Sequence, residues 1–419
     1  MSAADLAIVA ALVFGWGTLS ARLERFDVTA PIIFVLAGLL LTHGPLAVLG
    51  VTPSNELIKG LAEFTLALVL FSDASRVGLH ELRADSGLYV RLLGVALPLT
   101  IGLGTLLALA LTGTSIWLAL LVGAALAPTD AALGAGMMTN QVVPTRIRRL
   151  INVESGLNDG IATPFVLIAV AGAGTAEHAP GPTPGLALAE LLLGVLIGAA
   201  VGGTGGFLIK LARRRGWLAE GFAGAAVLAL AACAYACALA LHGNGFVAAF
   251  VGGLAFGAIG GRPSEGLMPF VEETGGLVSL LVWLAFGAIA VVPAMQDLSW
   301  QTGLYAVLSL TLIRMLPVAV ALAGGGLDRV AVAFVGWFGP RGLASVVFAL
   351  IALEDLGPSD ARPAVTVITV TVLLSVLVHG ATADPLARHY GPRLTLATAG
   401  PDEAGLPPLP ERRIIRRTS

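Results

Sequence analysis

Charged residues are scarce in this chain. They make up 12% of its 419 residues, and 57% of the residues are hydrophobic. A soluble domain carries about 25% charged residues, so the shortage excludes an ordinary water-soluble protein. No soluble domain is inserted between the apolar segments. The 53 glycines favour close contacts between membrane helices, whose interfaces are rich in small residues. The composition therefore predicts an all-α, polytopic integral membrane protein.

Cysteine is almost absent. Cys233 and Cys237 lie four residues apart in an alanine-rich apolar run, which favours packing over a disulfide or a metal site. No nucleophile–base set and no cluster of metal ligands is evident, so we expect neither an enzyme nor a bound cofactor. The formal charge of −2 gives no sign of nucleic-acid binding. The first apolar run lacks a basic leader and a small-residue cleavage site, so no cleavable signal is expected.

Long apolar segments fill most of the chain. A membrane span needs about 20 mostly apolar residues, and on that rule we predict thirteen spans. The stretch from residue 393 is rich in Pro, Gly and Arg, and we expect residues 393–419 to be a disordered tail. The predicted spans are approximately 4–20, 31–50, 56–73, 88–112, 115–138, 150–173, 185–210, 217–241, 244–261, 268–292, 301–323, 329–352 and 363–383.

Positive charges alternate between the predicted loops. Twenty of the 24 lysine and arginine residues follow odd-numbered spans or lie in the tail, whereas Lys59 and Arg362 alone follow even-numbered spans. Cytoplasmic loops carry the excess of positive charge. We therefore expect the N-terminus outside, the C-terminus in the cytoplasm, and the cell's inner (plasma) membrane as the location.

Two predicted spans are interrupted at their middles. The fifth carries Pro128-Thr129-Asp130, and the twelfth carries Gly339-Pro340-Arg341-Gly342. Proline removes a helix hydrogen bond, and non-helical backbone at membrane depth is tolerated only when it is buried or lines a cavity. Matching breaks in two halves indicate a transporter's central site. Spans four to six and eleven to thirteen would be inverted repeats, with the breaks crossing near the midplane. A simple proline kink is the alternative for either break.

A polar stretch at residues 152–160 lies inside the apolar segment at 150–173. It holds two carboxylates, Glu154 and Asp159, and ionisable groups at membrane depth are functional candidates. On a helix Glu154 shares a face with Asn158, and Ser155 shares one with Asp159. The alternative is a helix-capping box with Ser155 as its cap.

Few charges lie within the spans. Buried charges need partners, so each of the two arginines should have a carboxylate partner, which leaves acids over for a cation or a proton. Hard monovalent cations bind oxygen. Asp159, Ser155 and the backbone around Thr129 and Asp130 can form such a cage. The intramembrane charges are Glu63, Asp73, Asp130, Glu154, Asp159, Arg314 and Arg341.

These motifs together resemble a known family. Pro128-Thr129-Asp130, then Glu154-Ser155-x-x-Asn158-Asp159, then Gly339-Pro340-Arg341-Gly342-Leu343 resemble the monovalent cation:proton antiporters, in particular NhaP-type sodium/proton exchangers. The resemblance covers nearly the whole chain. It implies a homodimer in the lipid bilayer, with dimerisation helices at about 1–73 and 185–292 and an ion-transporting core at about 88–173 and 301–383. The implied substrates are a monovalent cation and a proton.

The resemblance also implies roles for single residues. Asp159 would carry the cation and the proton in turn, with Ser155, Thr129 and Asp130 as ligands or site-shaping groups. Glu154 would pair with Arg341 and hold the core around Asn158. Asp73 would line the cytoplasmic approach, although related chains often carry glutamate there. Arg314 matches an arginine found one span before the Gly-Pro-Arg-Gly motif.

Asn158 bears on stoichiometry. It precedes Asp159 where a second carboxylate would allow two protons to be exchanged for one cation, and an amide has no proton to release. Freed N–H groups at the fifth span's break can hold Asp130 ionised. We therefore expect electroneutral one-for-one exchange, most simply Na⁺ for H⁺ by alternating access. K⁺ or Li⁺ as the cation, and a non-antiporting channel or sensor, stay open. Glu63 is expected to be an interfacial residue, and His379 is a candidate pH sensor.

Overall fold

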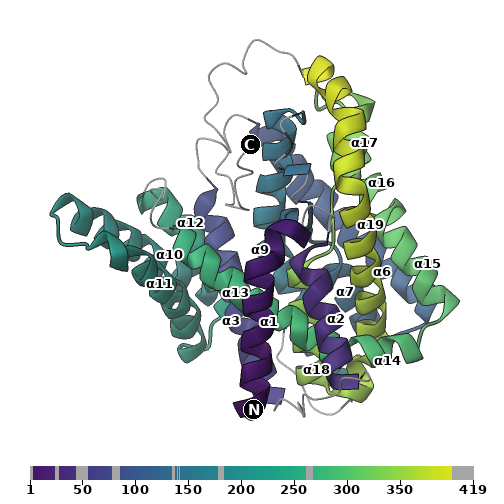
Figure 1. The fold of residues 1–419 in the computed structure, drawn as a ribbon, viewed down its shortest axis with the longest axis horizontal. Coiled ribbons are helices and arrows are strands. Elements are labelled where there is room, and N and C mark those ends of the chain that lie inside the picture. The colour runs from purple at the N-terminus through teal and green to yellow at the C-terminus, as the bar shows by residue number, and fades with distance from the viewer. Residues whose placement is uncertain are drawn as a thin grey trace.

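The computed structural model describes residues 3–23, 28–43, 55–77, 85–134, 137–138, 140, 142–177, 184–260 and 268–398, and every regular element among them is helical (Figure 1). In chain order they are α1 (Ala3–Leu23), α2 (Ala30–His43), α3 (Asn55–Arg76), α5 (Ser86–Arg91), η2 (Leu92–Ala96), α6 (Leu97–Thr112), α7 (Ile116–Ala125), η3 (Ala131–Gly134), α9 (Thr145–Glu177), α10 (Pro184–Arg214), α11 (Glu220–Ala240), α12 (Gly245–Gly260), α13 (Met268–Ile289), α14 (Val291–Gln296), α15 (Trp300–Leu310), α16 (Leu312–Leu322), α17 (Arg329–Trp337), α18 (Leu343–Leu356) and α19 (Pro358–Thr398).

Polar residues set several helix boundaries. Ser115 precedes α7, Ser299 precedes α15 and Asp328 precedes α17, and each side chain accepts a hydrogen bond from a backbone N–H in the first turn. Such caps satisfy donors that have no partner within the helix. Gly113 ends α6 in the left-handed conformation at φ 63°, which glycine adopts without the steric cost that a Cβ would bring.

Eight helices among the described residues are long and apolar enough to cross a membrane, and α2, α7 and α12 are shorter apolar helices. Each of the thirteen predicted spans overlaps one helix or consecutive helices. An all-helical membrane fold is confirmed, but the exact number of spans stays a prediction. The predicted tail begins too early, because α19 continues through residue 398; residues 399–419 lie outside the described part of the chain.

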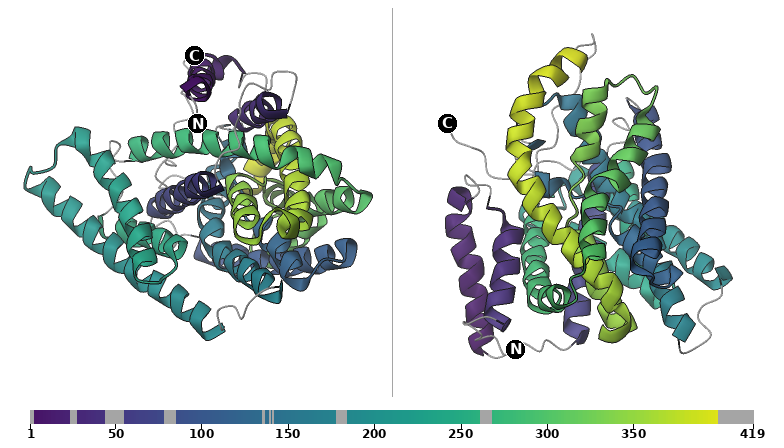
Figure 2. Two further views of the ribbon diagram at one scale, coloured as in Figure 1. Left: turned by 90° about the horizontal axis from the view of Figure 1, so that it is seen from below. Right: turned by 90° about the vertical axis from the view of Figure 1, so that its right-hand side faces the viewer.

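The helices pack in two groups. One contains α2, α3 and α10–α13, with α10 and α11 forming a wing on the left of Figure 1. The other contains α5, η2, α6, α7, η3, α9 and α15–α19 (Figure 2). Glycines allow the close contacts within the first group. A Cβ on Gly202 of α10 would lie 2.0 Å from the carbonyl oxygen of Gly252 on α12. The groups meet where α3 and α13 pack on α18 and where α3 and α12 pack on α9.

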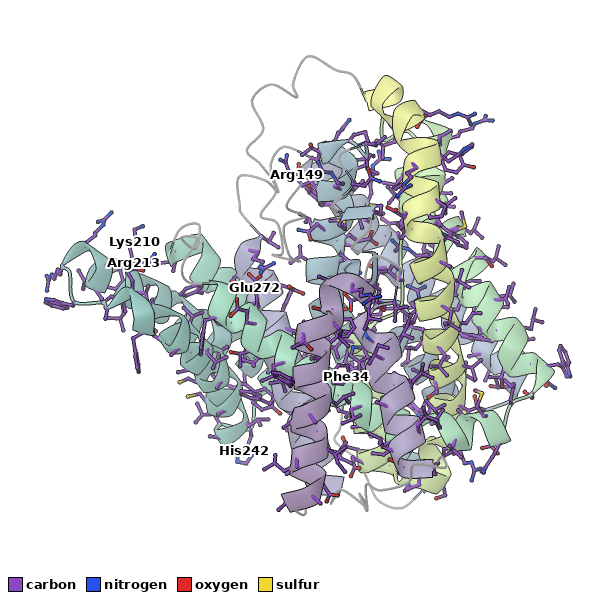
Figure 3. All side chains as sticks on the ribbon, in the orientation of Figure 1. Phe34, Arg149, Lys210, Arg213, His242 and Glu272 are labelled. Carbon is purple, nitrogen blue, oxygen red and sulfur yellow. The ribbon has the colours of Figure 1, made fainter. Side chains whose placement is uncertain are left out.

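Three labelled basic side chains lie toward the same end of the bundle. In Figure 3, Arg149, Lys210 and Arg213 lie toward the upper end, and His242 lies toward the lower end. The three basic residues all belong to loops or span ends predicted to be cytoplasmic. The arrangement therefore agrees with the alternation of charge along the sequence.

Candidate functional site

The two helices predicted to be interrupted are interrupted. α7 gives way to non-helical backbone over 126–130, and residues 338–342 separate α17 from α18. The breaks touch each other, because the N–H of Asp130 donates to the carbonyl of Pro340 over 2.8 Å. Two broken helices thus cross in the interior of the protein.

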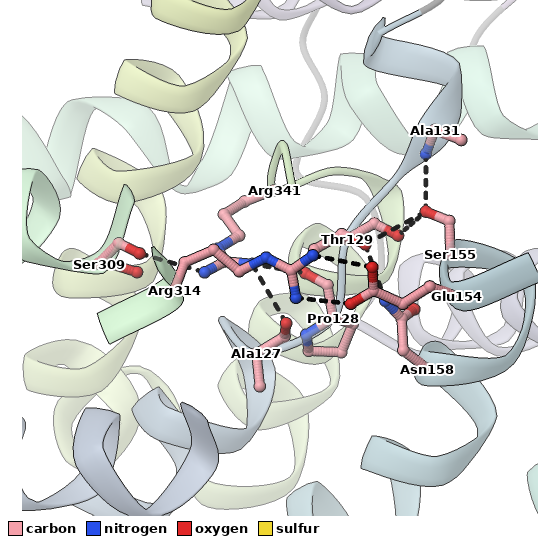
Figure 4. A network of polar contacts seen from close by, with 10 residues as sticks. All are labelled: Ala127, Pro128, Thr129, Ala131, Glu154, Ser155, Asn158, Ser309, Arg314 and Arg341. Atoms are coloured by element: carbon pink, nitrogen blue, oxygen red, sulfur yellow. Dashed lines mark hydrogen bonds and ion pairs between the residues drawn. The ribbon is translucent and has the colours of Figure 1, made fainter. Parts of the chain in front are cut away.

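Each break supplies a charged side chain to a helix end at the other break. Asp130 Oδ2 accepts a hydrogen bond from the N–H of Leu343, the first residue of α18, over 3.3 Å. Arg341 Nη1 donates to the carbonyls of Ala127 (3.1 Å) and Pro128 (3.2 Å), just beyond α7 (Figure 4). A carboxylate stabilises the positive N-terminal end of a helix, and a cation stabilises the negative C-terminal end.

Arg341 also stabilises a third interruption that the sequence did not predict. Its Nη2 donates to the carbonyl of Ser309 over 3.1 Å, at the end of α15. The chain turns at Thr311 (φ −114°, ψ −92°) before α16 begins. No glycine or proline occurs at residues 309–312, so no local signal marks this break. The buried guanidinium, 0% exposed, thus binds carbonyls from two helix ends.

The predicted pair between Glu154 and Arg341 is wrong. Glu154 on α9 binds Arg314 on α16 through two parallel hydrogen bonds, Nη1 to Oε1 at 2.6 Å and Nη2 to Oε2 at 2.9 Å. Both side chains are buried, at 2% and 1% exposed. The prediction assumed that each intramembrane cation needs a carboxylate. Carbonyls at interrupted helix ends carry partial negative charge, and Arg341 binds these instead.

Ser155, Thr129 and Asn158 come together at the crossing; the contact of Asn158 with Thr129 was not predicted. The hydroxyl of Ser155 donates to the carbonyl of Thr129 and accepts from the N–H of Ala131 over 2.9 Å. Asn158 Nδ2 donates to Thr129 Oγ1 over 2.8 Å. These bonds fix the broken segment against α9, and they place hydroxyl, amide and carbonyl oxygens in one small volume.

Asp159 is the next residue of α9 after Asn158, and its side chain is 9% exposed. The neighbouring face of α9 is made of small residues on which other helices pack closely. Asp73 of α3 lies against Gly156, where a Cβ would come within 3.7 Å of the Asp73 Cβ. Phe250 of α12 covers Gly160, where a Cβ would lie 2.2 Å from the ring. α3 and α12 therefore bound the space beside Asp159, and α3 brings Asp73 to it.

Glu63 lies away from this crossing, in a polar cluster in the first half of α3. Tyr235 donates its hydroxyl to Glu63 Oε2 over 2.9 Å, and Lys59 Nζ lies 3.9 Å from Glu63 Oε1. Lys59 also pairs with Asp355 at the end of α18. The contacts of Glu63 therefore join α3 to α11, within the first group of helices.

Serines of α18 and α19 also hold the crossing, and no sequence motif marks them. Ser345 donates to the carbonyl of Ala125, the last residue of α7, over 2.6 Å. Ser375 accepts from the N–H of Arg341 over 2.7 Å. The available signal was a hydroxyl inside an apolar run, which is too common in membrane helices to single out a residue.

Gly342 faces Asp130 so closely that no side chain fits between them. A Cβ there would lie 2.2 Å from the Asp130 Cβ and 2.3 Å from its Oδ2. We expect Gly342→Ala to push Asp130 away from the N-terminus of α18 and to destabilise the protein by about 1–3 kcal/mol, the usual cost of overpacking. Thermal unfolding of the purified protein measures this. Gly303→Ala is the control, because nothing lies within 4 Å of a Cβ there; equal stability of the two variants would contradict the expectation.

The chain as a whole matches a known transporter family. A family model described as "Sodium/hydrogen exchanger, transmembrane" matches residues 8–389. The chain belongs to the sodium/hydrogen exchanger family. The match runs from α1 into α19, so it includes both broken helices, the Glu154–Arg314 pair and Asp159.

Relatives in this family carry K⁺ in their names as well. A K(+)/H(+) antiporter NhaP2 of Shewanella oneidensis is 25% identical over 382 residues, covering 88% of this chain and 64% of the relative. A K(+)/H(+) antiporter NhaP of Alkalimonas amylolytica is 25% identical, covering 93% of this chain and 67% of the relative. This chain thus spans less than two thirds of the length of the Shewanella relative.

A solved structure shows the same fold. The sodium proton antiporter MjNhaP1 from Methanocaldococcus jannaschii superposes with a TM-score of 0.75 at 17% identity, covering 92% of this chain and 98% of that chain. The helical architecture is therefore that of an NhaP-type family member.

Proposed function

We propose that this protein is a secondary antiporter that exchanges a monovalent cation, Na⁺ in the first instance, for H⁺. The feature that supports the proposal is the place of Asp159 on α9, directly after Asn158 and one turn after Ser155, both of which bind the broken segment at Thr129. A carboxylate with hydroxyl and carbonyl oxygens nearby suits a hard cation. The same carboxylate binds a proton when the cation leaves.

The residues have two proposed roles: some bind the ion, and others keep those residues in position. Asp159 alternates between cation and proton, while Ser155 and Thr129 contribute oxygen ligands. Asp130 binds the N-terminus of α18, where a carboxylate is favoured. Asp73 lines the approach from the cytoplasm. The Glu154–Arg314 pair has no net charge, and it fixes α9, the helix that carries Asp159.

K⁺ is the second candidate cation, because the Shewanella and Alkalimonas relatives are named K(+)/H(+) antiporters. Both ions bind oxygen, so the choice depends on the size of the ligand cage. We propose further that the chain works as a homodimer in the plasma membrane, with its N-terminus outside. The first helix group would form the dimer contact, and the second would carry the ion.

Purified protein in liposomes with an internal pH-sensitive dye tests the proposal. Adding Na⁺, K⁺ or Li⁺ outside acid-loaded vesicles should raise the internal pH, and choline should not. The cation that gives half the maximal signal at the lowest concentration is the preferred substrate. A signal equal to that of protein-free vesicles for every cation would overturn the proposal.

The chemistry of the site predicts electroneutral exchange. Asn158 is an amide without a titratable proton, and Asp130 accepts a hydrogen bond from the N-terminus of α18. Asp159 alone then carries one proton or one monovalent cation, and the loaded carrier has the same charge either way. A membrane potential does work only on net charge moved, about 2.3 kcal/mol per charge per 100 mV.

Opposed pH and Na⁺ gradients across liposomes, with the potential set by a potassium ionophore, measure this. The gradient ratio at which net flux is zero should stay constant as the potential is varied. A zero-flux ratio that follows the imposed potential would rule out one-for-one exchange.

A further inference from the structure

A buried histidine joins the two halves of the second broken helix. His379 lies on α19, one turn after Ser375, and its ring is 1% exposed. Its Nδ1 lies 3.1 Å from Ser375 Oγ, and its Nε2 lies 3.0 Å from the carbonyl oxygen of Trp337, the last residue of α17. Ser375 Oγ in turn accepts from the N–H of Arg341, beyond the break. The ring therefore links both sides of the non-helical segment.

The donors and acceptors around the ring define how it is held. The N–H of Arg341 can only donate, so Ser375 Oγ accepts from it. Nδ1 of His379 lies 3.1 Å both from Ser375 Oγ and from the carbonyl oxygen of Ser375. The carbonyl of Trp337 can only accept, so Nε2 must carry a proton. The indole of Trp337 packs against the imidazole at 5.3 Å between ring centroids, and its Nε1 donates to Thr382 over 3.2 Å. These contacts hold the ring between α17 and α19.

This hydrogen-bonded path from Trp337 through His379 and Ser375 to Arg341 leads to the proposed cation site. Arg341, whose backbone it holds, donates to the carbonyls of Ala127 and Pro128, the two residues before Thr129. Trp337 and Arg341 have no helical hydrogen bond between them, because the chain over 338–342 is not helical. Without His379 the two half-helices would lose one of the contacts that set their spacing, and the guanidinium would lose part of its anchorage.

We propose that His379 is a positioning residue for cation binding: through Ser375 it holds Arg341, and through Arg341 it sets the oxygen ligands at Thr129. His379 does not touch the cation. Its contribution is to the geometry of the cage, so its loss should weaken cation binding more than it slows the exchange step. The inference rests on the proposed function for the identity of the substrate.

The test compares His379→Leu, His379→Gln, Ser375→Ala and the double variant His379→Leu/Ser375→Ala. We expect His379→Leu to raise the half-saturating Na⁺ concentration by about tenfold, the scale of one or two hydrogen bonds, with a maximal rate within about twofold of the parent. Glutamine can still donate toward Trp337 and should restore most of the affinity. The double variant should be no worse than the worse single variant, because both residues act along one path. His389→Leu, which replaces an exposed histidine on the same helix, should match the parent.

Two results would overturn the proposal. One is an unchanged half-saturating concentration in His379→Leu, even with a lower melting temperature, which would make the residue merely structural. The other is strict additivity of the two single effects. If His379→Leu does not fold, His379→Gln and Ser375→Ala still carry the comparison. The half-saturating Na⁺ concentration is also measured from the rise in melting temperature as Na⁺ is added. This second measurement needs no transport. A parent that binds Na⁺ without exchanging it would thus contradict the proposed function and leave this test intact.

Discussion

Asp159→Asn is expected to abolish exchange while the protein stays folded. The substitution keeps the shape of the side chain and removes only its ability to become negative. An amide can neither bind a proton at physiological pH nor neutralise a bound cation, so both halves of the cycle stop. Asp159 is 9% exposed and lies beside the packed faces of α3 and α12, so the isosteric change should leave the fold intact.

The measurement is cation-dependent alkalinisation inside proteoliposomes, with the melting temperature as the check on folding. Glu273→Gln, which neutralises an exposed carboxylate on α13, is the matched control and should exchange at the parental rate. Exchange by Asp159→Asn at a rate near that of the control would remove Asp159 from the central role.

Breaking the Glu154–Arg314 pair should have the largest effect on stability. Removing one partner leaves the other charge buried without compensation, which costs about 3–5 kcal/mol. We therefore expect Glu154→Leu and Arg314→Met each to lower the yield of folded protein and its free energy of unfolding by about that amount. The double variant replaces a buried ion pair by apolar groups of similar volume, and such replacements are often close to neutral.

A double-mutant cycle also decides which of the two arginines pairs with Glu154. The coupling energy between Glu154 and Arg314 should be a large part of each single effect, because the two share two hydrogen bonds. The coupling between Glu154 and Arg341 should be clearly smaller, since Arg341 binds carbonyls. Equal coupling to both arginines would contradict the observed pairing.

Local chemistry explains which features the sequence could predict. Pro128 and Pro340 lie at the interruptions, and proline favours a break because it has no N–H to donate. Proline alone does not decide the matter, since Pro164 lies inside α9 and Pro317 inside α16. Ser155 was predicted to lie near the backbone at Thr129, and it does. These features follow from the residue itself or from helix periodicity.

The partner of Glu154 and the interruption at Thr311 do not follow from any local rule. Two arginines were candidates for Glu154, and the sequence could not show that Arg341 would bind helix-end carbonyls. The turn at Thr311, between α15 and α16, has no glycine or proline beside it to mark it. Both features depend on how distant helices pack, so they become visible only in three dimensions.

Each break holds a charged side chain that stabilises a helix end at the other break, and this arrangement constrains how the protein can move. Asp130 and Arg341 each stabilise a helix end on the other side of the crossing. If one break slid past the other, two helix ends would lose their charged partners together. One of these partners is the fully buried Arg341, and leaving such a charge without compensation costs about 3–5 kcal/mol. We therefore expect the two breaks to move as one unit, and any sliding between helices to occur where α3, α12 and α13 meet α9 and α18.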